Sequence, residues 1–450
     1  MLGSLNTKSK DVIVIGGGVA GLLAAYFLDR AGYEVTLREA SARLGGLIQT
    51  EITPWGISEC AAHSLLVTDP VRKLCDELGV ELIPVHANST ARYILRNGKF
   101  RTFPLSIREV VKGFLRAYFI WAPRGKLPRN LTLRTWSDRF LGPAFTKYLV
   151  APMLRGIYGT TPDDITVGAA FPSLVVPRGH SLLSLQLAKF LRGKIPIFKR
   201  PPPPQMMAPR GGMGAFTAAL EAKLRERLGS RLILNSPVAE LPVGGNVLLA
   251  VPAGRAGSLL ATADPALSKL LKNTKYTALA SVTVFVERAG FSIKSQTMPL
   301  GIPKGIGVLM PEGENVDTLG ILFNSSSFAG RVHSEPNSTW VSLTAFLGGS
   351  QKPEELKFSD DDILSMIRGD LERLFGFRGE ISGARIHRWE NAVPRYNQSL
   401  TELWDAARLG WCAQPGRILF GNYTGQVSVR GMIEAAAEVQ HSLIQNDSEY

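Results

Sequence analysis

Cysteine is scarce in this sequence of 450 residues, which contains only Cys60, Cys75 and Cys412. Three cysteines are too few and too scattered for a disulfide framework or a zinc site, and their scarcity fits a reducing compartment. No uncharged apolar run reaches about 18 residues, and the first ten residues lack an apolar segment, so we expect neither a transmembrane helix nor a signal peptide. With only six histidines and no evident acid–base pair, the sequence names no catalytic general base and no metal site.

Positive charge, in contrast, is plentiful and unevenly placed. The chain carries a net +13, of which residues 92–210 carry +17 and the rest −4. Within this basic region, residues 106–158 have a helical pattern in which Arg108, Lys112 and Arg116 alternate with apolar residues. Such a pattern is typical of a helix in a membrane interface, and equally of a helix packed on its own domain. The apolar positions are Val110, Val111, Phe114, Leu115, Tyr118, Phe119 and Trp121.

The stretch around which the chain is organised is residues 11–21. Four apolar residues, 12–15, predict a buried strand, after which Gly16, Gly18 and Gly21 have G-x-G-x-x-G spacing before a helical pattern. Glycines at this spacing permit a tight turn, an approach to a pyrophosphate, and packing of helix on strand. A second predicted strand ends at Glu39, where an acid meets a ribose hydroxyl. The sequence therefore predicts a dinucleotide site in a Rossmann-like α/β unit.

Other elements follow from periodicity and turn residues. Asn97-Gly98 predicts a hairpin between strands near 90–95 and 99–103, and Pro201–Pro204 predicts a stiff extended segment. The other predicted strands are 232–238, 246–252, 276–287, 340–346 and 417–422, and the other predicted helices are 70–78, 215–228, 360–375 and 432–444.

Several further motifs carry a family resemblance. Arg43-Leu-Gly-Gly46 resembles the extended FAD fingerprint of the amine-oxidase-like flavoproteins. Over nearly its whole length the chain resembles the FAD-dependent protoporphyrinogen oxidases of that superfamily. The motifs behind this resemblance are residues 157–164 with 169–172, 209–214, 305–311 with 319–328, 391–396 and 421–429.

The resemblance implies an α/β fold with a Rossmann-like FAD-binding domain, a mixed-sheet substrate domain and an inserted helical membrane-associating domain. The FAD-binding domain would comprise 1–90, 209–252 and 386–450, the substrate domain 91–104, 166–208 and 253–385, and the helical insertion 105–165. Because the insertion coincides with the basic helical region, the two lines together favour binding to an anionic membrane surface.

It also implies site residues. FAD, held non-covalently, would have its pyrophosphate at Gly16, Gly18 and Gly21, its ribose at Glu39, and its adenine at the backbone of Val238. Arg92 would meet a propionate, since guanidinium binds carboxylates bidentately, and Leu309 and Phe328 would sandwich pyrrole rings. Arg92 could equally be an ordinary surface arginine, and Leu309 and Phe328 ordinary core. The remaining cofactor positions would be Arg43, Gly45, Gly46, Trp389, Gly421, Asn422 and Val427.

Three departures from the family pattern concern this site. Glu59-Cys60-Ala61 stands where Gly-Pro usually follows the acid, and Arg395 stands where glutamine is common. The segment from Val238 to Val251 is also short, which weakens the assignment of Val238.

The implied reaction is the six-electron oxidation of protoporphyrinogen IX to protoporphyrin IX, with hydride transfer to FAD, oxygen as acceptor and hydrogen peroxide as product. The alternatives are the same chemistry on coproporphyrinogen III and a flavin-binding scaffold without turnover. An amine oxidase fits less well because no aromatic cage or flavin-linking cysteine is apparent, and a carotenoid-type desaturase lacks the pattern of residues 305–328. We further expect a cytoplasmic protein held peripherally at the inner face of a membrane, a homodimer, contact with the next haem-pathway enzyme, and no nucleic-acid partner.

Overall fold

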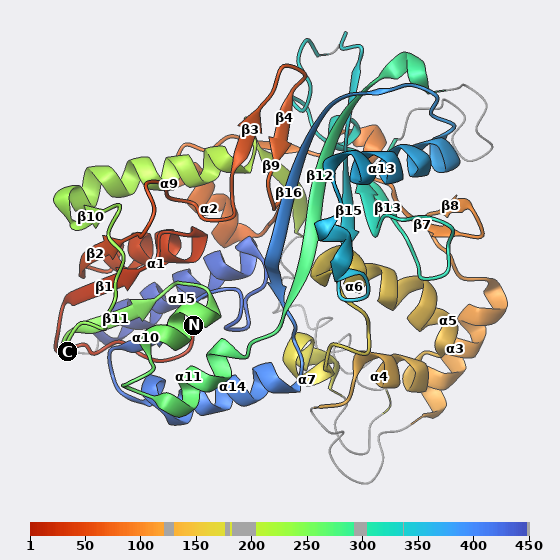
Figure 1. The fold of residues 1–450 in the computed structure, drawn as a ribbon. Helices are drawn as coiled ribbons and strands as arrows, with labels where there is room; N and C mark the ends of the chain where they lie inside the picture. Colours follow the sequence, from red (N-terminus) through yellow and green to blue (C-terminus); the bar gives the residue numbers. More distant parts are fainter. Residues whose placement is uncertain (121–129, 176–180, 182–203, 292–303, 336, 448–450) are drawn as a thin grey trace, which may run out of the picture.

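A computed structural model of the chain describes residues 1–450 except 121–129, 176–180, 182–203, 292–303, 336 and 448–450. Two large sheets dominate it, one on the left of Figure 1 and one on the right. The long strands β12 (Tyr276–Glu287) and β16 (Ile381–Pro394) form the side of the second sheet that is nearer the first. Helices below the second sheet form the part that the sequence predicted as an insertion.

The first sheet has five parallel strands in the order β10-β2-β1-β11-β17. Helices cover both of its faces, as expected for a Rossmann-like unit, because the strands β1, β11 and β17 carry buried apolar residues on both sides. The strands are β1 (Asp11–Ile15), β2 (Glu34–Arg38), β10 (Leu232–Ile233), β11 (Asn246–Leu249) and β17 (Arg417–Leu419). The helices on one face are α1 (Val19–Arg30), α2 (Asp69–Glu77), α9 (Met213–Leu228) and α15 (Val429–Asp447), and those on the other are α10 (Ala253–Leu259), α11 (Pro265–Lys272) and α14 (Gln398–Leu409).

The second sheet has seven strands in the order β16-β12-β15-β14-β13-β7-β8. It is mixed, as predicted, because β13 pairs with β7 in parallel and the other neighbours are antiparallel. Helix α13 (Asp360–Phe375) covers one face through a shared apolar core. The remaining strands are β7 (Arg92–Arg96), β8 (Lys99–Arg101), β13 (Gly307–Leu309), β14 (Gly320–Leu322) and β15 (Trp340–Gly348).

Two small sheets connect these units. The hairpin of β3 (Thr50–Ile52) and β4 (Ile57–Glu59) lies over the second sheet, where the indole of Trp55 stacks on Phe285. A three-stranded sheet joins β5 (Leu65–Val67), β9 (Gln205–Pro209) and β6 (Leu82–Pro84).

Short helices make up the predicted helical insertion. Helix α3 (Ile107–Phe119) begins with a capping box between Ser106 and Glu109. It is followed by α4 (Leu133–Phe140), α5 (Pro143–Phe145), a π-helical turn (Thr146–Val150), α6 (Ala151–Tyr158) and α7 (Val167–Ala170). Helix α12 is Asn324–Ser327, and the short 3₁₀ turns are Ala87–Ser89, Pro172–Leu174, Gly229–Arg231, Arg288–Gly290, Pro353–Lys357 and Trp411–Ala413. Among the described residues, no helix is long and apolar enough to cross a membrane.

The sequence placed most long elements correctly but extended four strands too far, among them β8, which ends two residues early at Arg101. Strand β10 stops at Ile233 because the chain turns at Asn235, which has φ +51°, and then reaches Pro237. Strands β11 and β17 each end three residues before their predicted limits. The predicted hairpin at Asn97-Gly98 is confirmed, since both residues have positive φ. Trp121 and residues 201–203 of the proline run lie outside the described residues.

Candidate cofactor and substrate site

The predicted dinucleotide loop lies at the carboxyl end of β1. Gly16 has φ +107°, and a Cβ added there would lie 2.5 Å from the carbonyl oxygen of Ala250. A Cβ on Gly21 would lie 1.8 Å from the carbonyl oxygen of Gly16. The fold itself therefore requires glycine at both positions, one for the turn and one for packing α1 against β1.

Gly18 differs from Gly16 and Gly21. A Cβ there would meet only the Cα of Gly46, at 4.0 Å, so protein packing gives no reason for glycine. Gly18 is also the N-cap of α1, and no side chain caps this helix end. The N-cap residue therefore offers no side-chain acceptor to the first N–H groups of α1, which is an arrangement that suits a phosphate. These observations fit the predicted pyrophosphate position.

Glu39 directly follows β2 and lies against the glycine loop. Its Oε2 accepts a hydrogen bond from the Gly17 N–H at 2.5 Å, and its Oε1 accepts two from Ser41 at 2.8 Å. Oε2 has accepted only one hydrogen bond and can accept another. The half-buried Glu39 is thus held in place and can still accept from a ribose hydroxyl, as predicted.

The Arg43–Gly46 turn lies beside the same loop. The Gly45 N–H donates to the Gly17 carbonyl at 2.8 Å, and Gly45 and Gly18 form a bridge. The Arg43 guanidinium donates to the carbonyls of Leu44 and Gly46, at 3.0 and 2.7 Å, so it closes its own turn. Gly46 is exposed and faces Gly18.

Val238 is brought to the same edge by the turn after β10. The Ser236 N–H donates to the Glu39 carbonyl at 2.8 Å. Val238 itself is buried, and its carbonyl accepts from Arg255 at 2.6 Å. Its carbonyl already has a protein donor, so its predicted contact with adenine stays a prediction.

The late motif reaches this edge through β17. Because β1, β11 and β17 are parallel, their carboxyl ends meet, and the Phe420 N–H donates to Leu249 at 3.0 Å. The Asn422 carbonyl accepts from the Tyr396 hydroxyl at 2.6 Å, which fixes the turn before α15. Gly421 is buried. Val427 is half-buried and packs against the apolar core that α10, α11 and α14 form on one face of the five-stranded sheet. The predicted cofactor residues of the first sheet thus converge on one edge.

The face of the second sheet that α13 leaves uncovered carries one continuous row of side chains. Strand register aligns Ile94 of β7, Leu309 of β13, Phe346 of β15, Ser281 of β12 and His387 of β16. Gly320 of β14 lies between Leu309 and Phe346 in this row. At about 4.8 Å between strands, Leu309 and His387 are roughly 19 Å apart. We call these six residues the sheet row.

Residues 50–63 lie over this face. The Trp389 indole N–H donates to the Cys60 carbonyl at 2.8 Å, and the His63 ring packs edge-on against Phe346 with ring centres 5.8 Å apart. The Thr50 hydroxyl accepts from the Gly214 N–H at 2.8 Å, at the start of α9. Residues 50–63 therefore connect the sheet row to α9, which packs on the five-stranded sheet. Cys60 of this segment is the hydrogen-bond partner of Trp389.

The predicted substrate residues fall into two places. Arg92 is exposed, points to the face of the sheet row, and has no hydrogen bond or ion pair among the described residues. Leu309 lies in the row and packs near Gly156 of α6, where an added Cβ would be 2.6 Å from Leu309 Cδ2. Phe328 is buried, with the Arg331 guanidinium 5.4 Å from its ring centre. The structure thus places Arg92 and Leu309 on the same face of the sheet. It places Phe328 beside Arg331, which donates to Glu59 and to the His63 carbonyl.

A buried ion pair at Glu59 was missed at the sequence level. The Arg331 guanidinium lies 2.6 Å from Glu59 Oε1, and both side chains are at most 5% exposed. The Thr50 hydroxyl and the Met213 N–H also donate to this carboxylate, at 2.6 and 2.9 Å. Burial raises the pKa of Glu59, opposed by Arg331 and these donors. No local pattern signals the pair, because Arg331 is distant in the chain.

His63 was also missed. Its Nε2 is buried without a hydrogen-bond partner in the described part of the chain, and Ser281 Oγ in the sheet row shares this property. Burial, with nearby Arg331 and His387, lowers the pKa of His63 to about 3. The imidazole is therefore neutral at physiological pH, and this face carries unused polar groups where a ligand can bind.

Comparison with known proteins agrees with this architecture. The family described as "Flavin containing amine oxidoreductase" matches residues 19–439. Among curated proteins, human protoporphyrinogen oxidase is 26% identical over 97% of this chain and 98% of its own length. The mitochondrial protoporphyrinogen oxidase of Nicotiana tabacum is 27% identical over 94% of this chain and 92% of its own.

Solved structures show the same fold. A "Putative protoporphyrinogen oxidase" from Exiguobacterium sp. 255-15 has a TM-score of 0.75, 21% identity, and coverage of 98% of this chain and 99% of its own. A putrescine oxidase variant has a TM-score of 0.66 and 16% identity, with 97% and 99% covered.

Proposed function

Since the chain belongs to the flavin containing amine oxidoreductase family and is a flavoprotein oxidoreductase with FAD as cofactor, we propose that it oxidises protoporphyrinogen IX to protoporphyrin IX with oxygen as acceptor. The observation that carries the substrate assignment is Arg92, which has no ion-pair partner in the described part of the chain and lies on the face of the sheet row beside apolar Ile94 and Leu309. A flat apolar macrocycle with carboxylates at its edge matches such a surface.

The expected contacts follow from strand register. Ile94 lies opposite Leu309 on one side and Arg101 of β8 on the other, while Arg92 lies opposite Gly307, which has no side chain to fill the space. Arg92 and Arg101 are exposed and border the same apolar strip. Arg96 is already bound to Glu109 at 2.8 Å. We therefore assign the propionates to the Arg92 end and the pyrrole rings to the strip.

The residues around the cofactor would hold and orient it. Gly18 and the N-terminus of α1 would accept the pyrophosphate, Glu39 the ribose, and the Arg43–Gly46 turn and Trp389 would border the flavin ring. FAD, when bound, supplies the acceptor for two electrons at a time and returns them to oxygen. His63 and Ser281 offer hydrogen-bonding groups toward the pyrrole nitrogens, and we assign neither a general base role.

The test is porphyrin fluorescence under air, with protoporphyrinogen IX and coproporphyrinogen III offered separately to the FAD-loaded protein. We expect porphyrin and peroxide formation well above autoxidation, with a higher kcat/KM for protoporphyrinogen IX. A preference for the tetracarboxylate would assign the reaction to coproporphyrinogen III, which the additional exposed Arg101 favours. No porphyrin from either substrate would contradict the proposal and leave a flavin-binding scaffold.

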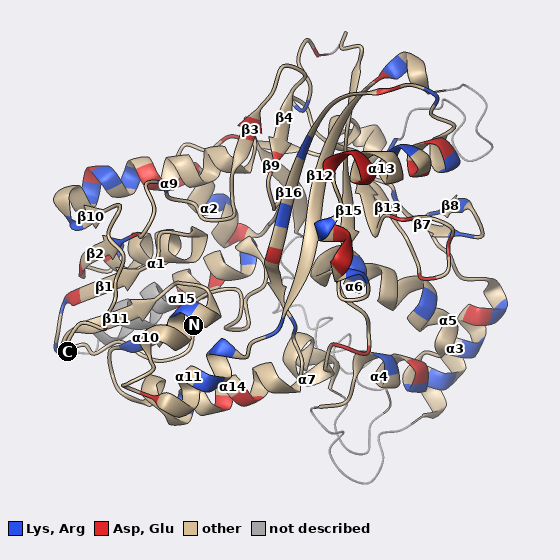
Figure 2. Ribbon diagram, in the orientation of Figure 1, with Lys and Arg blue, Asp and Glu red and all other residues tan. Residues whose placement is uncertain are grey.

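We also propose that α3 binds an anionic membrane surface. Its apolar residues recur every three to four positions and are exposed, with Ile107 at 83% and Phe119 at 66%. Arg108 and Lys112 lie beside this stripe, and Figure 2 shows basic residues along α3. A helix with an exposed apolar stripe and a basic flank is typical of an interfacial helix. The stripe is Ile107, Val111, Phe114, Leu115, Tyr118 and Phe119.

Vesicle co-sedimentation tests this second proposal. We expect binding to anionic vesicles that weakens at high salt and is lost in Phe114→Ser/Phe119→Ser, whereas Phe358→Ser, at an exposed phenylalanine in another region, leaves binding unchanged. A wild-type protein that stays in the supernatant at low salt, or a double variant that still sediments, would contradict it. Peripheral membrane localisation, a homodimer and contact with the next haem-pathway enzyme stay predictions.

A further inference from the structure

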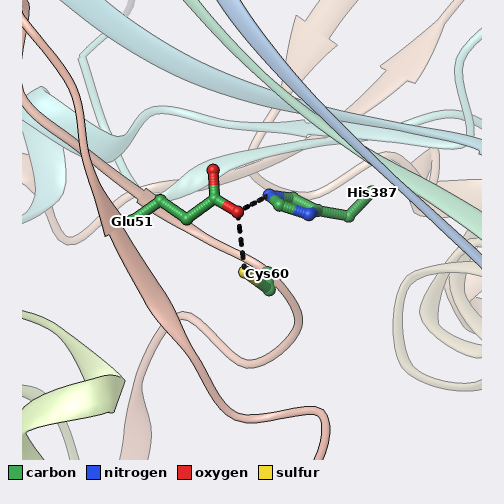
Figure 3. A group of neighbouring side chains, drawn as sticks. All are labelled: Glu51, Cys60 and His387. Atoms are coloured by element: carbon green, nitrogen blue, oxygen red, sulfur yellow. Dashed lines mark hydrogen bonds and ion pairs between the residues drawn. The ribbon is translucent and has the colours of Figure 1, made fainter.

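Three side chains that no proposed step uses lie side by side at the His387 end of the sheet row. Figure 3 shows Glu51 of β3, Cys60 after β4 and His387 of β16 pointing toward one another. Glu51 Oε1 is 4.0 Å from Cys60 Sγ and 4.0 Å from His387 Nε2. The three atoms all lie within 4.8 Å of one another.

The electron pairs of this cluster are largely unused. His387 Nε2 is buried and has no hydrogen-bond partner among the described residues. Leaving such a nitrogen unsatisfied costs free energy, so an arrangement that keeps it calls for a reason. The Cys60 side chain is buried, and its nearest polar contact is the long one to Glu51.

Surrounding contacts hold the three residues in position. The Arg385 Nε lies 3.3 Å from Glu51 Oε2, which leaves Oε1 directed at the cluster. The Trp389 indole N–H fixes the Cys60 carbonyl at 2.8 Å, and the same indole stacks on the His387 ring with an interplanar angle of 13°. Such outer contacts orient metal ligands in known sites.

We propose that Glu51, Cys60 and His387 bind a zinc ion. Carboxylate, thiolate and imidazole are the ligands that Zn²⁺ takes in proteins, whereas Mg²⁺ and Ca²⁺ take oxygen ligands. In a tetrahedral site at zinc–ligand distances of about 2.0–2.3 Å, the ligand atoms are about 3.3–3.6 Å apart. The three side chains therefore need to close by only about 1 Å, and water would take the fourth position.

Access and charge are compatible with this assignment. The Glu51 side chain is 32% exposed and the His387 side chain 13%, so an ion can reach the cluster from solvent. The carboxylate and the thiolate, once the Cys60 proton has left, together balance the charge of Zn²⁺. The site is invisible in the sequence because its ligands are widely spaced and match no zinc motif.

Cobalt provides the test, because the ligand-field bands of tetrahedral Co²⁺ lie at wavelengths beyond the flavin spectrum. We would titrate Co²⁺ into the FAD-loaded full-length protein and then add Zn²⁺ as competitor. The expected result is one equivalent of Co²⁺ with ligand-field and thiolate charge-transfer bands, which Zn²⁺ removes. Absence of a long-wavelength band in the wild-type protein would overturn the proposal.

Matched variants locate the ion. Cys60→Ser and His387→Gln should each weaken Co²⁺ binding at least about tenfold, with Cys60→Ser also losing the charge-transfer band. Cys75→Ser and His333→Gln, at a buried cysteine and at a histidine that contacts Thr53, should leave both unchanged. Far-ultraviolet circular dichroism and FAD content confirm that each variant is folded. Binding unaffected by both cluster variants, or abolished by Cys75→Ser, would overturn the assignment.

Discussion

The two sheets build their sites in different ways. At the edge of the five-stranded sheet, the candidate cofactor residues act mainly through backbone groups, helix ends and the absence of side chains, as at Gly18. On the seven-stranded sheet, the candidate substrate surface consists of side chains from six strands brought into register. A site built from backbone groups can be recognised in a short sequence motif. A site built from aligned side chains depends on the pairing of strands that are distant in the sequence.

The largest expected effect separates fold from ligand within the glycine loop. Gly21→Ala should prevent folding or cost at least about 4 kcal/mol, because its Cβ would lie 1.8 Å from the Gly16 carbonyl. Gly18→Ala should leave the unfolding of the apoprotein nearly unchanged and weaken FAD binding at least about tenfold. Urea unfolding and FAD titration measure both. Equal destabilisation by the two substitutions would remove the distinction between structural and ligand glycines.

A smaller effect concerns the contact between the two regions. Glu59→Gln should lower the free energy of unfolding by about 3 kcal/mol, because it leaves the Arg331 guanidinium buried without its counter-ion. Glu59→Gln/Arg331→Met should recover much of that loss. The matched control is Glu81→Gln, which breaks an ion pair whose side chains are both 60% exposed and should produce no resolvable change. Similar losses for both single variants would show that burial is not the cause.

His63, which packs against Phe346 of the seven-stranded sheet, makes the free energy of unfolding depend on pH. Its folded pKa is about 3 against 6.5 when unfolded, so the unfolded chain binds more protons between these values. Above pH 6.5, protonation of His63 therefore does not affect the free energy of unfolding. As the pH falls from 6.5 toward 3, the free energy of unfolding decreases because the unfolded chain is protonated at His63 and the folded chain is not. Between pH 7 and pH 5 the wild-type protein should lose about 2 kcal/mol more than His63→Gln. Parallel stability profiles for the two proteins in urea would contradict a buried neutral His63.

The smallest expected effect tests the carboxylate contact. Arg92→Ala should raise KM for protoporphyrinogen IX about tenfold, or about 1.4 kcal/mol, with kcat nearly unchanged, because an anchoring contact is lost equally from ground and transition states. Arg92→Lys should recover only part of this, since lysine does not bind bidentately. The control is Lys73→Ala, which removes an exposed side chain of α2. A fall in kcat with unchanged KM would assign Arg92 another role.

The same contrast decides what could be predicted from the sequence. Residues 11–39 predicted the strand, turn, helix and acid correctly because each signal is local. Tyr276–Glu287 and Asp360–Phe375 were predicted to the residue, since long periodic elements leave little ambiguity.

The sheet row and the buried pair could not be predicted in this way. Nothing near Ser281 indicates that it lies between Phe346 and His387, because register across β15, β12 and β16 is a tertiary property. Glu59-Cys60-Ala61 was noted only as a departure from the family pattern. The structure gives two of these residues specific contacts, Glu59 with Arg331 and Cys60 with Trp389.

The strand order also bears on how the protein is made. The five-stranded sheet contains β17, and the seven-stranded sheet contains β16, so neither can be completed before residues 381–419 have left the ribosome. Leu2 pairs with Leu419, which joins early and late residues of the chain. At about 5–20 residues per second, the unpaired edges of β11 and β12 stay exposed for many seconds of synthesis. We therefore expect flavin acquisition to be post-translational and nascent chains to depend on chaperones that cover strand edges.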